Sequence, residues 1–460
     1  MPANATTACD RRFFLRAAAA SAVAAWRSTA RAADPPPVNN PRATSGDRIE
    51  PDWQERLSIS VGPAKADLVG SDHRVLQAAV DYLAALGGGT VKILPGTYRL
   101  RGPVHLRSKV RLLGSGADAI LRKEPSTSTR LAADSDWFDQ EITLVDARGF
   151  QVGDGVCIRT RNPHNGGINV AKRILVARSG NRFKLDRALR DNYWRAGETT
   201  VSSLFPILSG EEIADACVES LVLDGNRAQN DNLDGNYAGC IFCQDCNRLT
   251  FRGVTACHYN GDGISWQICH DVLVENCQCH DNKGLGLHPG SGSQRPIIRG
   301  NHSHHNDIGL FFCWGVRHGL AENNLVEDNH NTGISIGHHD TENLIINNTV
   351  RRSGRWGVLF RPERGRDFAP HRNRFQQNRI FDSGPDDGVA IEVQGETEGV
   401  TIAGNEIVES RGPAKRIGIR INEKTHDIRL VDNHIRGCAR EVVDLRPATA
   451  PGKATPKGTT

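Results

Sequence analysis

The hydrophobic pattern between residues 239 and 421 is a repeat. A glycine is followed by an apolar residue, any residue and a second apolar residue, which gives the two-residue alternation of a strand with one buried face. The repeat starts at Gly239, Gly263, Gly284, Gly309, Gly333, Gly357, Gly388 and Gly418, with spacings of 24, 21, 25, 24, 24, 31 and 30 residues. The pattern therefore predicts one short strand per unit.

A second set of equivalent positions, here called a column, recurs once in each of the same repeat units. It consists of an apolar residue, two further residues and an asparagine, and it recurs at Asn276, Asn301, Asn324, Asn348, Asn378, Asn405 and Asn433. One strand and one turn asparagine per unit fit a coil that climbs about 4.8 Å, one strand spacing, per turn. We therefore predict an all-β fold, a right-handed parallel β-helix in which the asparagines hydrogen-bond along the stack.

Other elements are expected at the two ends of this coil. Residues 72–86 form an amphipathic pattern with Leu76, Ala79, Val80 and Leu83 on one face, so we expect a capping helix within about 70–90. The repeat is interrupted over residues of approximately 140–205, and this interruption predicts a small β-rich insertion. The β-helix with its cap is expected to span 51–445, followed by a disordered tail over 446–460.

The N-terminus has the features of an export signal. Residues 10–16 carry a twin-arginine pattern, an Ala-rich stretch follows over 17–25, and small residues surround Arg31. We expect a signal peptide over 1–32, a linker over 33–50, and a periplasmic or secreted protein exported by the twin-arginine route.

Composition narrows the classes of partner. No run of 18 or more apolar residues occurs, so no membrane-spanning helix is expected. Five arginines and one aspartate lie in residues 1–32, and the rest of the chain balances at 52 basic against 52 acidic residues. A balanced charge gives no reason to expect a nucleic-acid partner. We expect a monomer, because no oligomerising tail follows residue 445.

Residues 70–125 and 215–445 resemble the pectin-lyase-like (pectate lyase) superfamily of β-helix proteins. The motifs are most similar to those of polygalacturonases, at residues 260–264, 333–337 and 357–361. Two parts of that family's catalytic pattern are missing, because no carboxylate lies near residues 283–285 and Thr332 stands at the histidine position. Of the paired catalytic aspartates, only Asp262 carries over. The resemblance implies a secreted carbohydrate-active enzyme, a polysaccharide lyase or a glycoside hydrolase, with a polysaccharide as its partner.

Candidate functional residues occupy one equivalent position just after each repeated strand, and together these positions form a column. Counting from each glycine, this column reads Cys243, Gln267, His288, Cys313, Gly337, Arg361, Glu392 and Asn422. A neutral histidine is a suitable base for proton abstraction next to a sugar carboxylate, which an arginine would pair with. The predicted catalytic residues are His288, His338, His339, Arg361, Asp262 and Glu392. The predicted substrate-binding residues are Gln267, Trp314, Trp356, Asp340 and Glu363.

Three functions follow from these residues. The first is β-elimination or epimerisation of an acidic, uronate-containing polysaccharide. The second is hydrolysis of the polygalacturonase type, through Asp262 and a second carboxylate such as Glu392. The third is a non-catalytic glycan-binding or cell-surface β-helix, which would need aromatic platforms but no base.

Histidines and cysteines cluster in the same region. Eleven of the 17 histidines fall between residues 258 and 339. The turn column places His258, His280, His305 and Asp328 on successive coils, where they would form either a plain stacking ladder or a divalent-cation site. No cofactor is firmly predicted. Cys257 and Cys279 are assigned to one column on adjacent coils, within disulfide distance.

Overall fold

The computed structural model describes residues 33–38, 50–162 and 165–447. The chain divides after Asp34, and the elements below belong to the unit that begins at Pro35. The expected signal peptide over 1–32 and most of the expected linker and tail lie outside the described residues.

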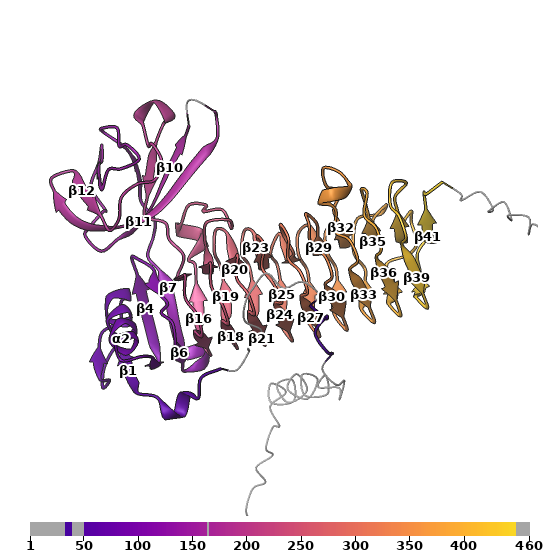
Figure 1. The fold of residues 1–460 in the computed structure, drawn as a ribbon, viewed down its shortest axis with the longest axis horizontal. Helices are drawn as coiled ribbons and strands as arrows, with labels where there is room; N and C mark the ends of the chain where they lie inside the picture. Colours follow the sequence, from indigo (N-terminus) through magenta and orange to yellow (C-terminus); the bar gives the residue numbers. More distant parts are fainter. Residues whose placement is uncertain (1–32, 39–49, 163–164, 448–460) are drawn as a thin grey trace, which may run out of the picture. The chain divides into compact units, whose positions relative to one another are not determined.

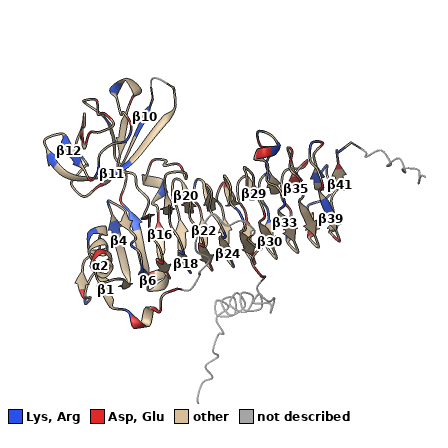
Figure 2. Ribbon diagram, in the orientation of Figure 1, with Lys and Arg blue, Asp and Glu red and all other residues tan. Residues whose placement is uncertain are grey.

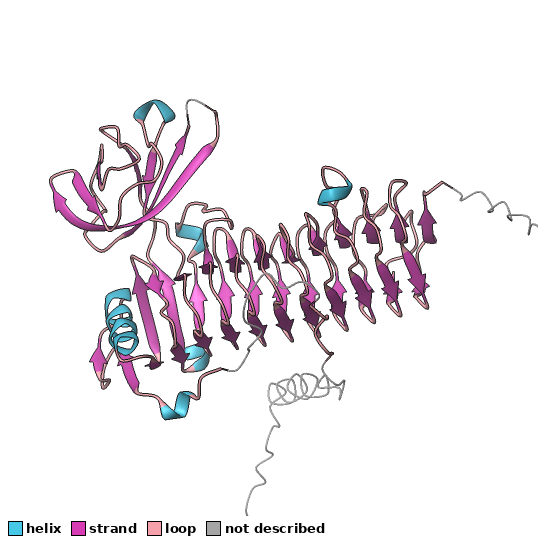
Figure 3. Cartoon of the chain, viewed as in Figure 1, coloured by secondary structure: helices cyan, strands magenta, loops and turns pink. Residues whose placement is uncertain are grey.

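Three parallel sheets form a β-helix, and each coil contributes one strand to each sheet (Figures 1 and 3). Sheet 1 contains, in order, β5 (Val104–His105), β14 (Leu208–Glu211), β17 (Gly239–Gln244), β20 (Asp262–Gln267), β23 (Leu285–Gly290), β26 (Ile308–Phe311), β29 (Thr332–Ile336), β32 (Trp356–Phe360), β35 (Val389–Val393), β38 (Ile417–Ile421) and β41 (Arg440–Asp444).

Sheets 2 and 3 complete the coils. Sheet 2 contains β2 (Leu68–Val69), β1 (Ser58–Gly62), β3 (Gly89–Ile93), β6 (Val110–Gly114), β15 (Cys217–Glu219), β18 (Thr250–Arg252), β21 (Leu273–Glu275), β24 (Ile297–Arg299), β27 (Leu320–Glu322), β30 (Leu344–Ile346), β33 (Arg374–Gln376), β36 (Thr401–Ala403) and β39 (Arg429–Val431). Sheet 3 contains β4 (Gly96–Leu100), β7 (Ala119–Lys123), β16 (Val222–Asp224), β19 (Thr255–Cys257), β22 (Gln278–His280), β25 (His302–His304), β28 (Leu325–Glu327), β31 (Thr349–Arg351), β34 (Arg379–Phe381), β37 (Glu406–Val408) and β40 (His434–Arg436).

The core lies inside the coils. In sheet 1, Ile264, Leu287, Leu310, Ile334 and Val358 are in register on successive strands, and all are at most 1% exposed. Their burial explains the repeated apolar positions, because each coil alone cannot cover its own apolar face. The predicted right-handed parallel β-helix is confirmed.

The asparagine column forms a ladder in the turn between sheets 2 and 3. From Asn324 onward, each side chain accepts hydrogen bonds from the backbone N–H and Nδ2 of the preceding asparagine. Each also donates to a backbone carbonyl in the sheet 2 strand of the preceding coil. The members run from Asn301 through Asn324, Asn348, Asn378 and Asn405 to Asn433. The prediction is wrong at Asn276, which has a positive φ, and Cys277 N donates to Asn301 in its place.

A helix and an inserted sheet flank the first coils. Helix α2 (His73–Ala85) begins after Asp72, whose carboxylate caps Arg74 N and Val75 N, and buries the four predicted residues Leu76, Ala79, Val80 and Leu83. The six-stranded insertion contains β8 (Ser128–Arg130), β9 (Glu141–Thr143), β10 (Gly155–Arg161), β11 (Ile168–Ser179), β12 (Arg182–Leu185) and β13 (Thr200–Ser202), with an apolar core of its own. Its strands begin earlier than residue 140, because β8 pairs with β13.

Short 3₁₀ helices occupy the connections: η1 (Trp53–Glu55), η2 (Gly116–Asp118), η3 (Arg195–Gly197), η4 (Arg227–Gln229) and η5 (Arg366–Phe368). In the described part of the chain, no helix has the length and apolarity needed to cross a membrane. Acidic and basic residues are interspersed along the coils (Figure 2).

Candidate functional site

The residues that line up on the outer face of sheet 1 differ from those of the predicted column. Pairing between strands places these residues in line: Ser209, Phe242, Ser265, His288, Phe311, Ser335, Leu359, Glu392 and Arg420. A second outward line contains Gln244, Gln267 and Gly290. The predicted column mixed these two lines and included Cys243, which is in register with the buried Trp266.

The error arose because the repeated glycines do not occupy equivalent positions in every coil. Gly263 is in register with Gly286 rather than with the predicted Gly284, and Gly357 is in register with Ala390 rather than with Gly388. Several coils carry two candidate glycines, and periodicity alone does not distinguish them. His288 and Glu392 therefore lie in the first line, while Gln267 lies in the second.

Asp262 and His288 form a buried pair on this face. Oδ2 of Asp262 lies 2.7 Å from Nδ1 of His288, and Oδ1 accepts a hydrogen bond from Leu285 N at 2.9 Å. An ionised carboxylate only accepts hydrogen bonds, so Nδ1 carries a proton, and in the neutral imidazole Nε2 presents a lone pair. Nε2 is buried and has no hydrogen-bond partner among the described residues. Ser265 Oγ also approaches Nδ1, at 3.2 Å.

Glycines allow the close packing around this pair. A Cβ atom on Gly235 would lie 2.0 Å from Oδ2 of Asp262, and one on Gly284 would lie 2.4 Å from Oδ1. Gly290 leaves space for Gln267, because a Cβ atom there would lie 2.3 Å from the Gln267 amide oxygen. The dyad is therefore enclosed by backbone, and its two side chains are 2% and 3% exposed.

A cavity of about 100 Å³ lies on the same face, beside β17 and the inserted sheet. Lys172, from β11, donates to Tyr237 O at 2.6 Å and stacks over Phe242, with Nζ 3.7 Å from the ring centroid. Burial lowers the pKa of Lys172 to about 8. Phe242 is in register with Ser265 and two strands from His288 in the first outward line, so this ammonium group lies on the same face as the dyad, two strands along the sheet. No sequence pattern indicated Lys172, because the insertion has no repeat.

Arg361 lies on the other side of the dyad. Its guanidinium stacks on Phe311 at 4.2 Å, and the Phe311 ring in turn contacts the His288 ring at 5.5 Å between centroids. Arg361 donates to Ser335 Oγ and Phe312 O at 2.8 Å each, and Oε1 of Glu363 lies 3.4 Å from its Nε. Its side chain is 16% exposed, and the Asp340 carboxylate also lies 3.5 Å from it, so two carboxylates flank this guanidinium.

An aromatic patch adjoins Arg361. Trp314, which is 53% exposed, stacks on His338 at 4.3 Å, and Phe368 from η5 stacks on the same imidazole at 5.1 Å. His339 meets the edge of His338 at 4.6 Å. His338 lies between two aromatic rings and only 3.5 Å from Glu363, which leaves Trp314 as the group in this patch best placed for a sugar ring.

Two predicted groups are occupied elsewhere. Asp340 is fully buried and accepts from Gly315 N, Val316 N and Gly337 N, so it closes a turn rather than binding substrate; burial raises its pKa. Trp356 Nε1 donates to Glu392 Oε2 at 2.7 Å.

Glu392 is an anchored carboxylate. Burial opposes its ionisation, but hydrogen bonds from Gln394, Asn422 and Arg420 hold its pKa below the usual value. Asp262 on β20 and Glu392 on β35 are five strands apart in sheet 1, which corresponds to about 24 Å. Inverting hydrolysis needs carboxylates about 6.5–9.5 Å apart. The predicted hydrolytic pair is therefore wrong.

The predicted histidine column is wrong at His280, which is in register with Cys257 and His304. The other three predicted members, His258, His305 and Asp328, share a positive-φ turn position on their coils, and Asp281 stands at that position in place of His280. Arg352 holds the Asp328 carboxylate through contacts of 2.7 and 2.6 Å. Burial, followed by the neighbouring histidines, lowers the pKa of His304 to about 4.

The predicted disulfide column fails for the same reason. Cys279 is in register with Ala256, and Cys257 and Cys279 are both free thiols.

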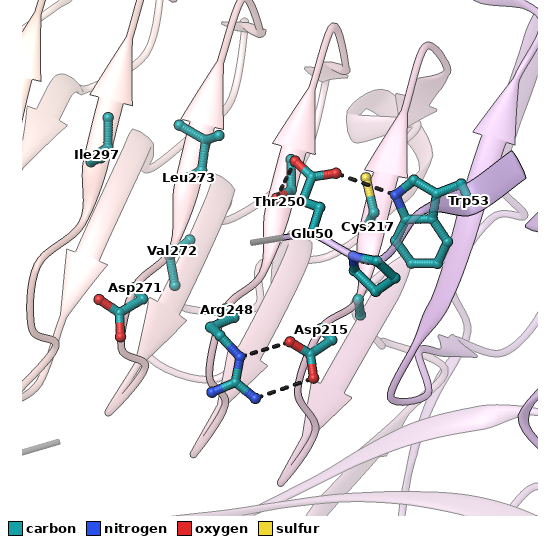
Figure 4. A pocket seen from close by; sticks show the side chains of 12 residues that line it. Glu50, Trp53, Asp215, Cys217, Arg248, Thr250, Asp271, Val272, Leu273 and Ile297 are labelled. Carbon is teal, nitrogen blue, oxygen red and sulfur yellow. Dashed lines mark hydrogen bonds and ion pairs between the residues drawn. The ribbon is translucent and has the colours of Figure 1, made fainter. Parts of the chain in front are cut away.

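A further pocket of about 50 Å³ lies on the outer face of sheet 2 (Figure 4). Glu50 accepts hydrogen bonds there from Trp53 at 3.3 Å and from Thr250 at 3.1 Å, and Arg248 forms a bidentate pair with Asp215. Arg252 also binds Glu50, at 2.7 Å. These polar groups satisfy one another, so this pocket anchors the segment before β1 to the coil.

Comparisons with known proteins agree on the fold. A family model for a right-handed β-helix region matches residues 239–407 and 312–449. Mannuronan C5-epimerase AlgE1 of Azotobacter vinelandii is 23% identical over 308 residues, a match that covers 67% of this chain and 16% of the relative's own length.

Similar solved structures include two with TM-scores of 0.51 and 0.50. The A-module of mannuronan C-5 epimerase AlgE4 of Azotobacter vinelandii aligns with a TM-score of 0.51 and 16% identity, covering 83% of this chain and 96% of that chain. ORF18 of Geobacillus virus E2 aligns with a TM-score of 0.50 and 12% identity, covering 80% of this chain and 62% of that chain. At these identities the likeness establishes the right-handed parallel β-helix and nothing finer.

Proposed function

We propose that this chain is a carbohydrate-active enzyme that acts on a uronate-containing polysaccharide by removing the proton at C5 of the sugar. The observation that carries the proposal is the buried Asp262–His288 pair, whose Nε2 has no hydrogen-bond partner among the described residues. The mannuronan C5-epimerases that share this fold support the choice of substrate class.

The C5 proton of a uronate is acidic because it lies next to the carboxylate. His288 Nε2 would accept this proton, and Asp262 would stabilise the imidazolium that forms. The electron pair left on C5 delocalises into the carboxylate, whose charge the buried Gln267 amide would meet with a hydrogen bond. Returning a proton to the opposite face gives the epimer. Expulsion of the oxygen at C4 gives instead a C4–C5 double bond, and the leaving oxygen takes up a proton.

Neighbouring sugars would be held by groups on either side of the dyad. Lys172 and Arg361 supply cations for carboxylates, and Trp314 supplies an exposed ring for stacking. Because the dyad is enclosed, substrate entry requires the segment around Gly235 or the Phe311 ring to move.

The test is a panel of polymannuronate, polyguluronate, polygalacturonate and a neutral glucan. Three signals are followed: ultraviolet absorbance of unsaturated uronate, new reducing ends, and the proton NMR spectrum of the product. We expect absorbance or a new epimer on a uronate polymer, lost in His288→Ala and kept in His434→Ala, a control on β40 at the far end of the β-helix.

Three results would contradict the proposal. Reducing ends without absorbance or epimer would indicate hydrolysis. Inertness toward all uronates would indicate a binding protein. Full activity in His288→Ala would remove the assigned base.

A further inference from the structure

We propose that His258, His280 and Asp281 form a site for a divalent transition-metal ion, with Zn²⁺ as the best match. These three residues are called the histidine cluster below. The inference does not rest on the proposed function, because it concerns the turns that follow sheet 3.

The fold brings these residues together from two successive coils. His258 follows β19, His280 is the last residue of β22, the next strand of sheet 3, and Asp281 follows it. His258 and Asp281 both have positive φ, of 52° and 56°, in equivalent turns. Their side chains consequently leave the turns close to the same point.

The donor atoms are spaced for one ion. One atom from each of the three residues lies within 4.8 Å of the others. His258 Nε2 lies 3.9 Å from Asp281 Oδ2, and His280 Nδ1 lies 2.7 Å from the same oxygen. Ligand atoms at about 2.0–2.1 Å from a tetrahedral zinc are about 3.3 Å from one another. The distances of 3.9 Å and 2.7 Å between these donor atoms lie on either side of that separation.

Further donors stand beside the cluster. Asp224, on β16, and Cys257 form a second group with His258 that also lies within 4.8 Å. Asp224 Oδ1 is 3.7 Å from His258 Nδ1. His258 Nδ1 faces this second group and Nε2 faces Asp281, so one ion held by the histidine cluster would take Nε2, and solvent water would complete its four-ligand shell.

The donor chemistry selects the metal. Two imidazoles and a carboxylate, with a thiol nearby, suit Zn²⁺ and similar transition metals. Ca²⁺ prefers a shell of six to eight oxygens, which this cluster does not supply. The side chains of His258 and Asp281 are 50% and 45% exposed, so an ion reaches the cluster from solvent without opening the fold.

The cluster differs from the ion pairs elsewhere on this sheet. Glu327 and Asp328, two coils further on, are neutralised by Arg351 and Arg352. In the described part of the chain, no arginine or lysine forms an ion pair with the Asp281 carboxylate, whose partners are His258 and His280; Arg227 donates instead to the Asp281 backbone carbonyl at 3.1 Å. A metal ion is the cation that would satisfy this carboxylate and both imidazoles together.

The experiment uses the full chain, stripped of metal and free of any histidine tag. Zn²⁺ and Co²⁺ are titrated in by calorimetry, and the visible spectrum of the Co²⁺ form is recorded. We expect one ion per chain, visible bands of a four-coordinate Co²⁺ site, and a rise in melting temperature of about 2–4 °C with Zn²⁺, since a ligand that binds only the folded state stabilises it.

Variants locate the site. His258→Ala and His280→Ala should each weaken Zn²⁺ binding at least about tenfold and abolish the Co²⁺ bands, while circular dichroism shows an intact fold. His434→Ala, an exposed histidine on β40 of the same sheet, is the matched control and should bind as the wild type does.

Absence of stoichiometric binding would overturn the proposal. Equal binding by His258→Ala and the wild type would overturn it as well. A stabilisation by Ca²⁺ as large as that by Zn²⁺ would contradict the argument from nitrogen donors.

Discussion

Replacement of Asn348 by alanine tests the hydrogen-bonded ladder that holds successive coils together. Asn348 is 0% exposed; it accepts from Asn324 N at 3.0 Å and from Asn324 Nδ2 at 2.8 Å, and it donates to Ala321 O at 3.0 Å and to Asn378 Oδ1 at 2.9 Å. Alanine removes the acceptor of a buried backbone N–H and the side-chain donor to a buried carbonyl. Each unsatisfied buried group costs about 1–3 kcal/mol, so we expect a loss of about 2–5 kcal/mol in the free energy of unfolding.

The matched control is Asn433→Ala, at the last position of the same ladder. Asn433 makes the same contacts to Asn405 but is only half-buried, so water can replace them and the expected loss is about 1 kcal/mol. Urea unfolding followed by circular dichroism gives both values. Hydrogen exchange of residues 320–350 shows whether the damage stays local, as expected for a stack of repeats. Equal losses at the two positions, or none at Asn348, would refute the reasoning.

Three further predictions concern the outer face of sheet 1. Asp262→Asn keeps an acceptor for Leu285 N but presents an amide N–H to His288, which favours the histidine tautomer protonated at Nε2. Turnover should fall about 10²–10⁴-fold while the fold persists, and selective ¹⁵N-histidine NMR should report the new tautomer. Unchanged turnover would exclude a base role for His288. Lys172 has a pKa of about 8 in the folded state, below its unfolded value, so the unfolded chain binds more protons between about pH 8 and 10.4. The free energy of unfolding should therefore rise with pH across that window. Lys172→Met should flatten this rise in denaturation curves, and an unaltered dependence of the free energy of unfolding on pH would contradict the burial argument. Trp314→Ala should raise KM about 2–10-fold with little change in kcat, since a stacked aromatic pair contributes about 0.5–1.5 kcal/mol; a fall in kcat alone would count against a binding role.

The repeat made the fold predictable. Each coil must bury an apolar side chain at the same place, so positions such as Ile264 and Ile334 reveal the strand, and Asn324 and Asn348 reveal the turn. Helix α2 was readable because its buried face follows the helical period from Leu76 to Leu83.

The site was only partly predictable, for two physical reasons. Side-chain register depends on which glycine begins the strand, and the choice of Gly284 over Gly286 shifted His288 into the wrong line. Lys172 comes from an insertion that the repeat does not describe, and its position over Phe242 depends on tertiary packing alone.

The most direct test of the central claim is isotope incorporation at C5. The protein is incubated with polymannuronate in D₂O, and the deuterium content at C5 of the recovered sugars is measured by NMR and mass spectrometry. The account predicts deuterium at C5 of the new epimer, or a C4–C5 double bond with no hydrogen at C5, in the wild type and in His434→Ala but not in His288→Ala. A product that forms while every C5 hydrogen is retained would contradict proton abstraction by the Asp262–His288 pair.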